Sequence, residues 1–145
     1  MRRSVSGALP RRHFVGALSL LGLGLITGEA HAGSYLTRAA VLLRAAEQEA
    51  EVLRRRLADK ELAQVLHRVA SARVDAARAM SVPKDVASAH PHVLLVLEAY
   101  ERAADAAERG DGQAFLVAVA RAREETSTLR AVLKQLGWEL PELKD

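Results

Sequence analysis

Apolar residues recur every three or four positions along four stretches of the chain, which is the spacing of one face of an α-helix. In the first stretch the repeating positions are Leu36, Ala39, Leu43, Ala46, Ala50, Leu53 and Leu57. No proline or glycine interrupts residues 34–81, and the β-branched residues there do not alternate with polar ones as they would in a strand. The first stretch therefore predicts a helix over about 34–57.

A second apolar repeat begins after Leu57 in a different phase. Its positions are Leu62, Leu66, Val69, Ala72, Ala76 and Met80. The five-residue step from Leu57 to Leu62 turns the apolar face by about 140° at ~100° per residue, so one straight helix could not bury both faces against the same partner. We expect a tight turn at 58–60, with Asp59 as N-cap of a second helix over about 61–81. A single long helix over 34–81 is the alternative, because no strong helix breaker lies there.

Two further helices follow the proline at position 83. The third is predicted over about 90–109, with His90 or Ser88 as its cap and Pro91 in its first turn. Its apolar positions are Val93, Leu97, Tyr100, Ala104 and Ala107. Gly110 is a natural left-handed terminator, and Asp111 is placed to cap a fourth helix over about 112–136. The apolar positions of this fourth helix are Phe115, Val119, Ala122, Thr126, Leu129, Leu133 and Leu136.

Four helices of this length joined by short loops predict an all-α fold, an antiparallel up-down-up-down four-helix bundle. The bundle domain would comprise residues 33–145, with a tail over 137–145 that folds back over one end. Many of the core positions are alanines, which allow helices to approach closely.

The first 32 residues have the character of an export signal. Arg11 and Arg12 precede an apolar run from Phe14 to Ile26, and Ala30-His31-Ala32 supplies the small-x-small pattern that signal peptidase cuts. The arginine pair with Phe14 two residues on resembles the twin-arginine (Tat) signal, whose route carries folded proteins. We therefore expect residues 1–32 to be a cleaved signal peptide, and the protein to be exported to the periplasm or an equivalent secreted or lumenal compartment.

Removal of this segment changes the charge of the chain. The net charge is +3, from 21 basic and 18 acidic residues. Four of the basic residues and one acidic residue lie in 1–32, so residues 33–145 carry 17 of each sign and are formally neutral. Nucleic acid as a partner would need a sustained basic excess and is not expected. The apolar run is too short to span a bilayer, and no transmembrane span is expected after it.

The composition also narrows the chemistry. The chain contains no cysteine, which excludes disulfides, thioether-linked haem, thiolate zinc sites and cysteine nucleophiles. We find no Gly-x-Ser-x-Gly elbow, no glycine-rich phosphate loop and no Glu-x-x-His pair of the di-iron kind. The run Arg54-Arg55-Arg56 fits the dipole at the end of the first helix, with phosphate binding as the less favoured interpretation. We expect no enzymatic activity.

A metal site is the one alternative that particular residues favour. His90 and His92 flank Pro91, and Met80 lies in the preceding helix end. Two imidazoles with a nearby thioether would suit copper, or another transition metal if a carboxylate joins them. The structural alternative is that one histidine caps the helix and the other is exposed. His67 is expected on the solvated side of the second helix. No cofactor is predicted under the leading interpretation.

Two families of small exported four-helix bundles resemble this chain. The segment from Pro83-Lys84-Asp85 to Val132–Gly137 resembles the PsbQ-type lumenal subunit of photosystem II, which implies a cofactor-free bundle that binds a membrane complex. Residues 68–85 and the hairpin 103–122 are similar in pattern to the periplasmic b-type cytochromes, and the c-prime cytochromes share the architecture. The first helix has no methionine, the fourth has neither methionine nor histidine, and cysteine is absent, so the haem function of these families is not implied.

These observations favour an accessory or interaction module with a protein partner, with homodimer formation left open. An uncovered Leu42, Leu94 or Val96 in the folded chain would mark a partner surface.

The cleavage prediction is tested by the N-terminus of the protein purified from its source compartment. Intact mass and N-terminal sequencing are expected to give a chain that begins at Gly33 and lacks the four leader arginines. A product that still begins at Met1 would contradict both the leader and the neutral charge of the mature protein.

Overall fold

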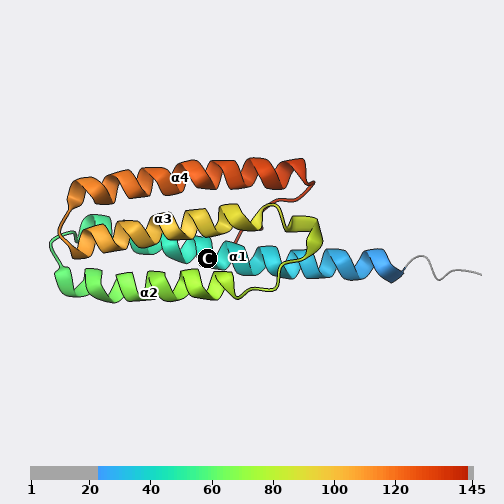
Figure 1. Cartoon of the computed structure of the whole chain (residues 1–145), viewed down its shortest axis with the longest axis horizontal. Coiled ribbons are helices and arrows are strands. Elements are labelled where there is room, and N and C mark those ends of the chain that lie inside the picture. The colour runs from blue at the N-terminus through green and yellow to red at the C-terminus, as the bar shows by residue number, and fades with distance from the viewer. Residues whose placement is uncertain (1–22, 144–145) are drawn as a thin grey trace, which may run out of the picture.

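The structure is a computed structural model, which describes the backbone of residues 23–143 and the side chains of residues 31–143. Four α-helices make up the fold: α1 (Leu23–Arg55), α2 (Lys60–Arg78), α3 (His90–Glu108) and α4 (Gly112–Gln135). A short 3-10 helix, η1 (Lys84–Val86), lies between α2 and α3. Successive helices run antiparallel (Figure 1), so the predicted all-α up-down-up-down bundle is confirmed, and no strand occurs among the described residues.

The turn between α1 and α2 forms where the apolar repeat changes phase. The Asp59 carboxylate accepts a hydrogen bond of 3.0 Å from the Leu62 N–H, which makes it the N-cap of α2. Asp111 caps α4 in the same way, accepting from the Ala114 N–H at 2.9 Å. Gly110 and Gly137 end α3 and α4 with φ angles of 73° and 79°, a region that favours glycine. Two helices therefore replace the single long helix over 34–81.

The start of α3 differs from the prediction. Its N-cap is Ala89, and neither His90 nor Ser88 contributes a capping side chain. The turn from η1 runs directly into the helix, so that the His90 N–H donates to the Ala87 carbonyl. Because these first N–H groups already have backbone acceptors, the helix begins without a side-chain cap. Pro91 lies in the first turn as expected.

The first helix extends further toward the N-terminus than residue 34. It begins at Leu23 and includes Ala30, and the Ala32 side chain is fully buried. Three leader residues, Arg11, Arg12 and Phe14, lie outside the described residues, as does the side chain of Ala30. No helix in the described part of the chain has the length and apolar character needed to cross a bilayer.

The apolar face of α2 is the predicted one only in part, because Leu66 and Met80 pack against the core but the middle of the repeat does not. Val69 is 40% exposed, and Ala72 and Ala76 are exposed as well. The face that packs into the bundle is formed instead by Ala63, Ala70, Arg73, Val74 and Ala77. Its alanines recur every seven residues, and their small side chains let α2 lie close to its neighbours. The repeats predicted for α1 and α3 do face the core.

Helix α3 lies at the centre of the bundle and packs against all three other helices (Figure 1). Helices α1 and α2 also pack on each other, whereas α1 and α4 share no extensive contact. The largest fully buried side chains include Tyr35, Leu53, Leu97, Phe115, Leu129 and Leu133. The bundle is thus closed on three sides, and on the fourth side α1 and α4 leave a gap that the C-terminal segment covers in part.

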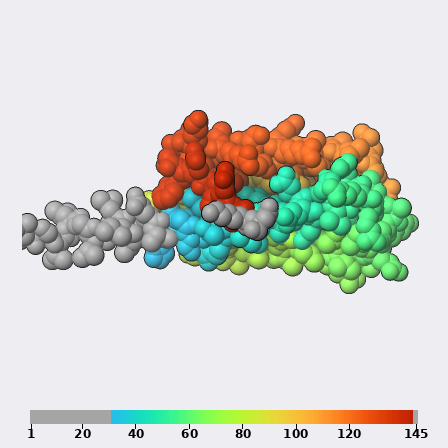
Figure 2. Space-filling model, turned by 180° about the vertical axis from the view of Figure 1, so that it is seen from behind, coloured from blue at the N-terminus to red at the C-terminus, as the bar shows by residue number. Residues whose placement is uncertain are grey.

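The C-terminal segment folds back from the end of α4 onto α1. After Gly137 the chain turns back, and Trp138 and Leu140 pack against the core. The Arg44 guanidinium on α1 donates a hydrogen bond to the Leu143 carbonyl. Figure 2 shows this red segment lying over α1 beside α4.

The contribution of the α4 N-cap to stability can be tested by mutation of Asp111. Replacement of Asp111 with alanine (Asp111→Ala) removes the acceptor of the Ala114 N–H and is expected to lower the free energy of unfolding by about 1 kcal/mol. The matched control is Asp85→Ala, since Asp85 is exposed and makes no hydrogen bond among the described residues. Denaturant unfolding followed by circular dichroism measures both. If the two variants were equally stable, the hydrogen bond from the Ala114 N–H to Asp111 would not stabilise the fold, contrary to this prediction.

Candidate functional site

The histidines proposed as metal ligands are held by different neighbours. His90 Nδ1 lies 2.8 Å from the Tyr35 hydroxyl, and the two rings meet edge to face with centroids 5.8 Å apart. This contact joins α3 to α1. Burial lowers the pKa of His90 and raises the pKa of Tyr35 to about 12, so both groups stay neutral near pH 7.

His92 faces α4 instead. Its Nδ1 is buried without a hydrogen bond and lies 3.9 Å from the Glu125 carboxylate, which is itself buried and paired with Arg121. Met80 is half-buried against the core. Within the described residues, no group of three or more histidine, cysteine or acidic side chains is arranged to hold a metal ion. The metal site at Met80, His90 and His92 therefore stays a prediction without a preformed ligand set.

His67 does not lie free on the surface. Its Nδ1 is 2.6 Å from the Glu108 carboxylate, which ties α2 to α3. The Ser71 hydroxyl donates to Glu101 at 2.6 Å, and Arg78 pairs with Glu98 at 2.9 Å along the same interface. The side chains around His67 thus form a polar rim that joins two helices.

Helices α1 and α2 are joined by a partly buried ion pair that the sequence pattern did not reveal. The side chain of Arg73 is only 8% exposed, and its guanidinium donates to Glu49 on α1. Arg73 occupies a place on the buried face of α2 that an apolar residue would normally take. Burial of a charged group requires such a partner, because its desolvation would otherwise be too costly.

The arginine run at the end of α1 is committed to nearby carboxylates. Arg54 and Arg55 donate to Glu51 at 2.8 and 2.9 Å, and Arg56 pairs with Asp59 at 2.6 Å. The hydrogen bond from Arg54 is the main reason that the pKa of Glu51 falls to about 2. These local pairs account for the run without a phosphate.

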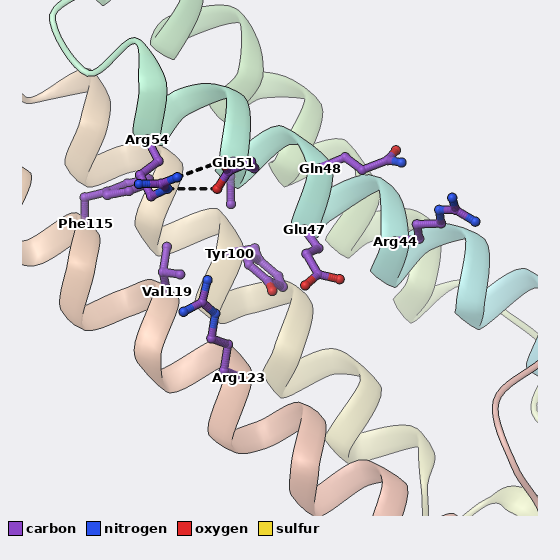
Figure 3. Close-up of a pocket in the computed structure, with 10 residues that line it drawn as sticks. Arg44, Glu47, Gln48, Glu51, Arg54, Tyr100, Phe115, Val119 and Arg123 are labelled. Carbon is purple, nitrogen blue, oxygen red and sulfur yellow. Dashed lines mark hydrogen bonds and ion pairs between the residues drawn. The ribbon is translucent and has the colours of Figure 1, made fainter. Parts of the chain in front are cut away.

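The described residues form a groove with a volume of about 360 Å³ on the side of the bundle between α1 and α4; we call it the α1–α4 groove. Helix α1 contributes five long polar side chains to it, which are Arg44, Glu47, Gln48, Glu51 and Arg54. Helix α3 contributes Tyr100 at the floor, and α4 contributes Phe115, Val119 and Arg123. Figure 3 shows Tyr100 lying between Glu47 of α1 and Arg123 of α4.

Three polar groups in the α1–α4 groove have no side-chain partner among the described residues. The Tyr100 hydroxyl makes no hydrogen bond with the described residues, and among them neither Glu47 nor Arg123 has an ion-pair partner within 4.0 Å. Burial raises the pKa of Tyr100 above 10, Glu47 raises it further, and Arg123 lowers it. The groove thus combines an apolar floor with a hydroxyl, one carboxylate on its α1 edge and one guanidinium on its α4 edge.

Sequence reasoning placed Tyr100 and Phe115 in the core and did not bring them together with Glu47 and Arg123. The missing information was that α1 and α4 do not close on each other. Of the three residues named as markers of a partner surface, Val96 is buried, and Leu42 and Leu94 are half-buried.

No protein-family model, curated protein or solved structure matches this chain. The resemblances to PsbQ-type subunits and to the cytochrome bundles therefore stay predictions.

The electrostatics of the α1–α4 groove can be tested by titration of Tyr100. In a Tyr35→Phe background Tyr100 is the only tyrosine, and its ultraviolet titration is expected to have a midpoint above 10. The variant Glu47→Gln should lower this midpoint, because the Glu47 carboxylate repels the tyrosinate, whereas Arg123→Gln should raise it, because the Arg123 guanidinium attracts the tyrosinate. Circular dichroism checks that each variant is folded. A midpoint that moves in neither variant would place Tyr100 outside the influence of both groups.

Proposed function

We propose that this protein is an exported, non-enzymatic interaction module whose α1–α4 groove receives an amphipathic helical segment of a partner protein. The observation that carries the proposal is the open fourth side of the bundle, where α1 and α4 stand apart over Tyr100. A helix laid between two helices is a common way for a protein to complete a hydrophobic groove. The export pattern of residues 1–32 supports a partner in the same compartment.

The charges of the groove define the chemistry of the partner segment. Arg123 on the α4 edge favours an acidic side chain, and Glu47 on the α1 edge favours a basic one. The Tyr100 hydroxyl can hydrogen-bond to a polar group between them. A partner helix with an acidic and a basic residue on its two flanks would satisfy these groups, whereas a uniformly charged ligand would leave one of them opposed.

The neutral charge of residues 33–145 agrees with this partner class. A module that bound nucleic acid or an anionic membrane surface would carry an excess of basic residues, and this part of the chain has equal numbers of each sign. The residues that line the groove include both signs as well. Specificity for the partner would therefore come from the positions of a few charged side chains and not from the net charge of the module.

The test uses capture of partners from extract of the source compartment, followed by affinity measurement with the captured protein. The variant Arg123→Glu is expected to weaken binding about tenfold or more, because it places a like charge against the partner. The matched control is Arg130→Glu, since Arg130 is also an exposed arginine of α4 but does not line the groove. This control should bind within about twofold of the unaltered protein.

Hydrogen exchange of the complex then locates the contact. Protection is expected in residues 44–54 and 115–123, on the two edges of the groove. Equal binding by Arg123→Glu and Arg130→Glu would contradict the proposal, as would recovery of no partner together with turnover of a substrate.

A further inference from the structure

Helix α2 carries a second apolar stripe, which faces away from the bundle. We call it the outer stripe; it consists of Leu62, Val65, Val69, Ala72, Ala76 and Ala79. The steps alternate between three and four residues, as in the contact seam of a coiled coil. Val65 is 55% exposed, Val69 is 40% exposed and the three alanines are exposed, while Leu62 is half-buried.

The described part of the chain offers this stripe no partner. Helix α2 packs on α1 and α3 through its other face, where Ala63, Ala70 and Ala77 are buried. The outer stripe thus has the spacing of a packing seam and the exposure of a surface. A continuous apolar stripe of this kind is typical of a protein interface.

The charges beside the outer stripe also follow the seven-residue period. Glu61, Arg68 and Asp75 lie along one flank and alternate in sign. Glu61 and Arg68 make no ion pair with any described residue. Asp75 is highly exposed, and its one ion pair is a long contact of 3.4 Å with Arg78, a residue of the same helix. These charges are therefore available to a partner along the same flank.

We propose that a second copy of this chain covers the outer stripe, with the two α2 helices antiparallel about a two-fold axis. In the register that sets Val69 opposite the partner's Ala72, Val65 meets the partner's Ala76 and Leu62 meets the partner's Ala79. Large residues then pack against small ones along the whole seam. The same register sets Arg68 beside the partner's Asp75, and the symmetry repeats this ion pair on the second copy.

The parallel arrangement does not fit these charges. It would bring Arg68 beside the partner's Arg73, a like charge. Arg73 is also buried and paired with Glu49, so its side chain is not available to a second copy of the chain. The flank of α2 is thus complementary to itself only in the antiparallel orientation, which favours a second copy over an unrelated protein.

The test measures the oligomeric state of the protein purified from its source compartment by analytical ultracentrifugation over a range of concentrations. A monomer–dimer equilibrium is expected. The variant Val69→Glu places a charge in the middle of the seam and should raise the dissociation constant by about 100-fold. Its matched control is Val117→Glu, because Val117 is an exposed valine of α4, outside both the outer stripe and the groove. This control should leave the dimer unchanged.

Charge exchange tests the orientation. Arg68→Glu alone and Asp75→Arg alone should each weaken the dimer about tenfold, because each puts like charges together twice. The double variant restores the pair with its signs exchanged and should recover the dimer. A protein that is monomeric at all concentrations, or a dimer that Val69→Glu leaves intact, would overturn the proposal. A double variant as weak as the single ones would overturn the antiparallel register.

This inference is independent of the α1–α4 groove. The dimer forms from the purified protein alone and uses no groove residue, so either proposal can fail without the other.

Discussion

The close approach of three helices to α3 is the constraint on which the rest of the bundle depends. Helix α3 is nearly all apolar toward its neighbours, and five of its buried positions are alanines, namely Ala99, Ala103, Ala104, Ala106 and Ala107. Short side chains on the central helix let α1, α2 and α4 pack around it at short distance. A central helix with three neighbours leaves two of those neighbours apart, so the open side between α1 and α4 is a result of the same packing that stabilises the fold.

Polar groups are distributed according to how closely the helices approach. Between α2 and α3 the edge of the interface holds His67–Glu108 and Ser71–Glu101, and between α1 and α2 the buried Arg73 pairs with the half-buried Glu49. Between α1 and α4 the corresponding side chains, Glu47 and Arg123, point into a groove and do not meet. The same kinds of residue thus serve as cross-links where helices touch and line a groove without an ion-pair partner among the described residues where they do not.

Local signals in the sequence were sufficient to predict the four helices and the turns from α1 to α2 and from α3 to α4. Asp59 and Asp111 cap their helices through hydrogen bonds to residues three positions on, and Gly110 ends α3 through its own φ angle. Such interactions depend on a few neighbouring residues, which the sequence displays directly. The boundary between α1 and α2 followed from the change of phase after Leu57.

Interactions between distant segments were beyond the sequence pattern. The choice of Ala63 and Ala70, and not Val69 and Ala72, as the buried face of α2 depends on how closely α1 and α3 approach it. His67 was expected in solvent, because nothing near it in the chain indicates Glu108. Glu98 of α3 likewise pairs with Arg78 of α2, which lies 20 positions away in the chain. Apolar periodicity alone cannot rank two stripes of similar quality on one helix.

The C-terminal segment places the only tryptophan of the chain at a junction of the fold. Trp138 packs against the core just after Gly137, on the segment that Arg44 holds to α1 through the Leu143 carbonyl. Its indole fluorescence therefore reports the docking of this segment specifically, while the far-ultraviolet signal reports the four helices. A difference between these two optical signals during unfolding would separate release of the tail from melting of the bundle.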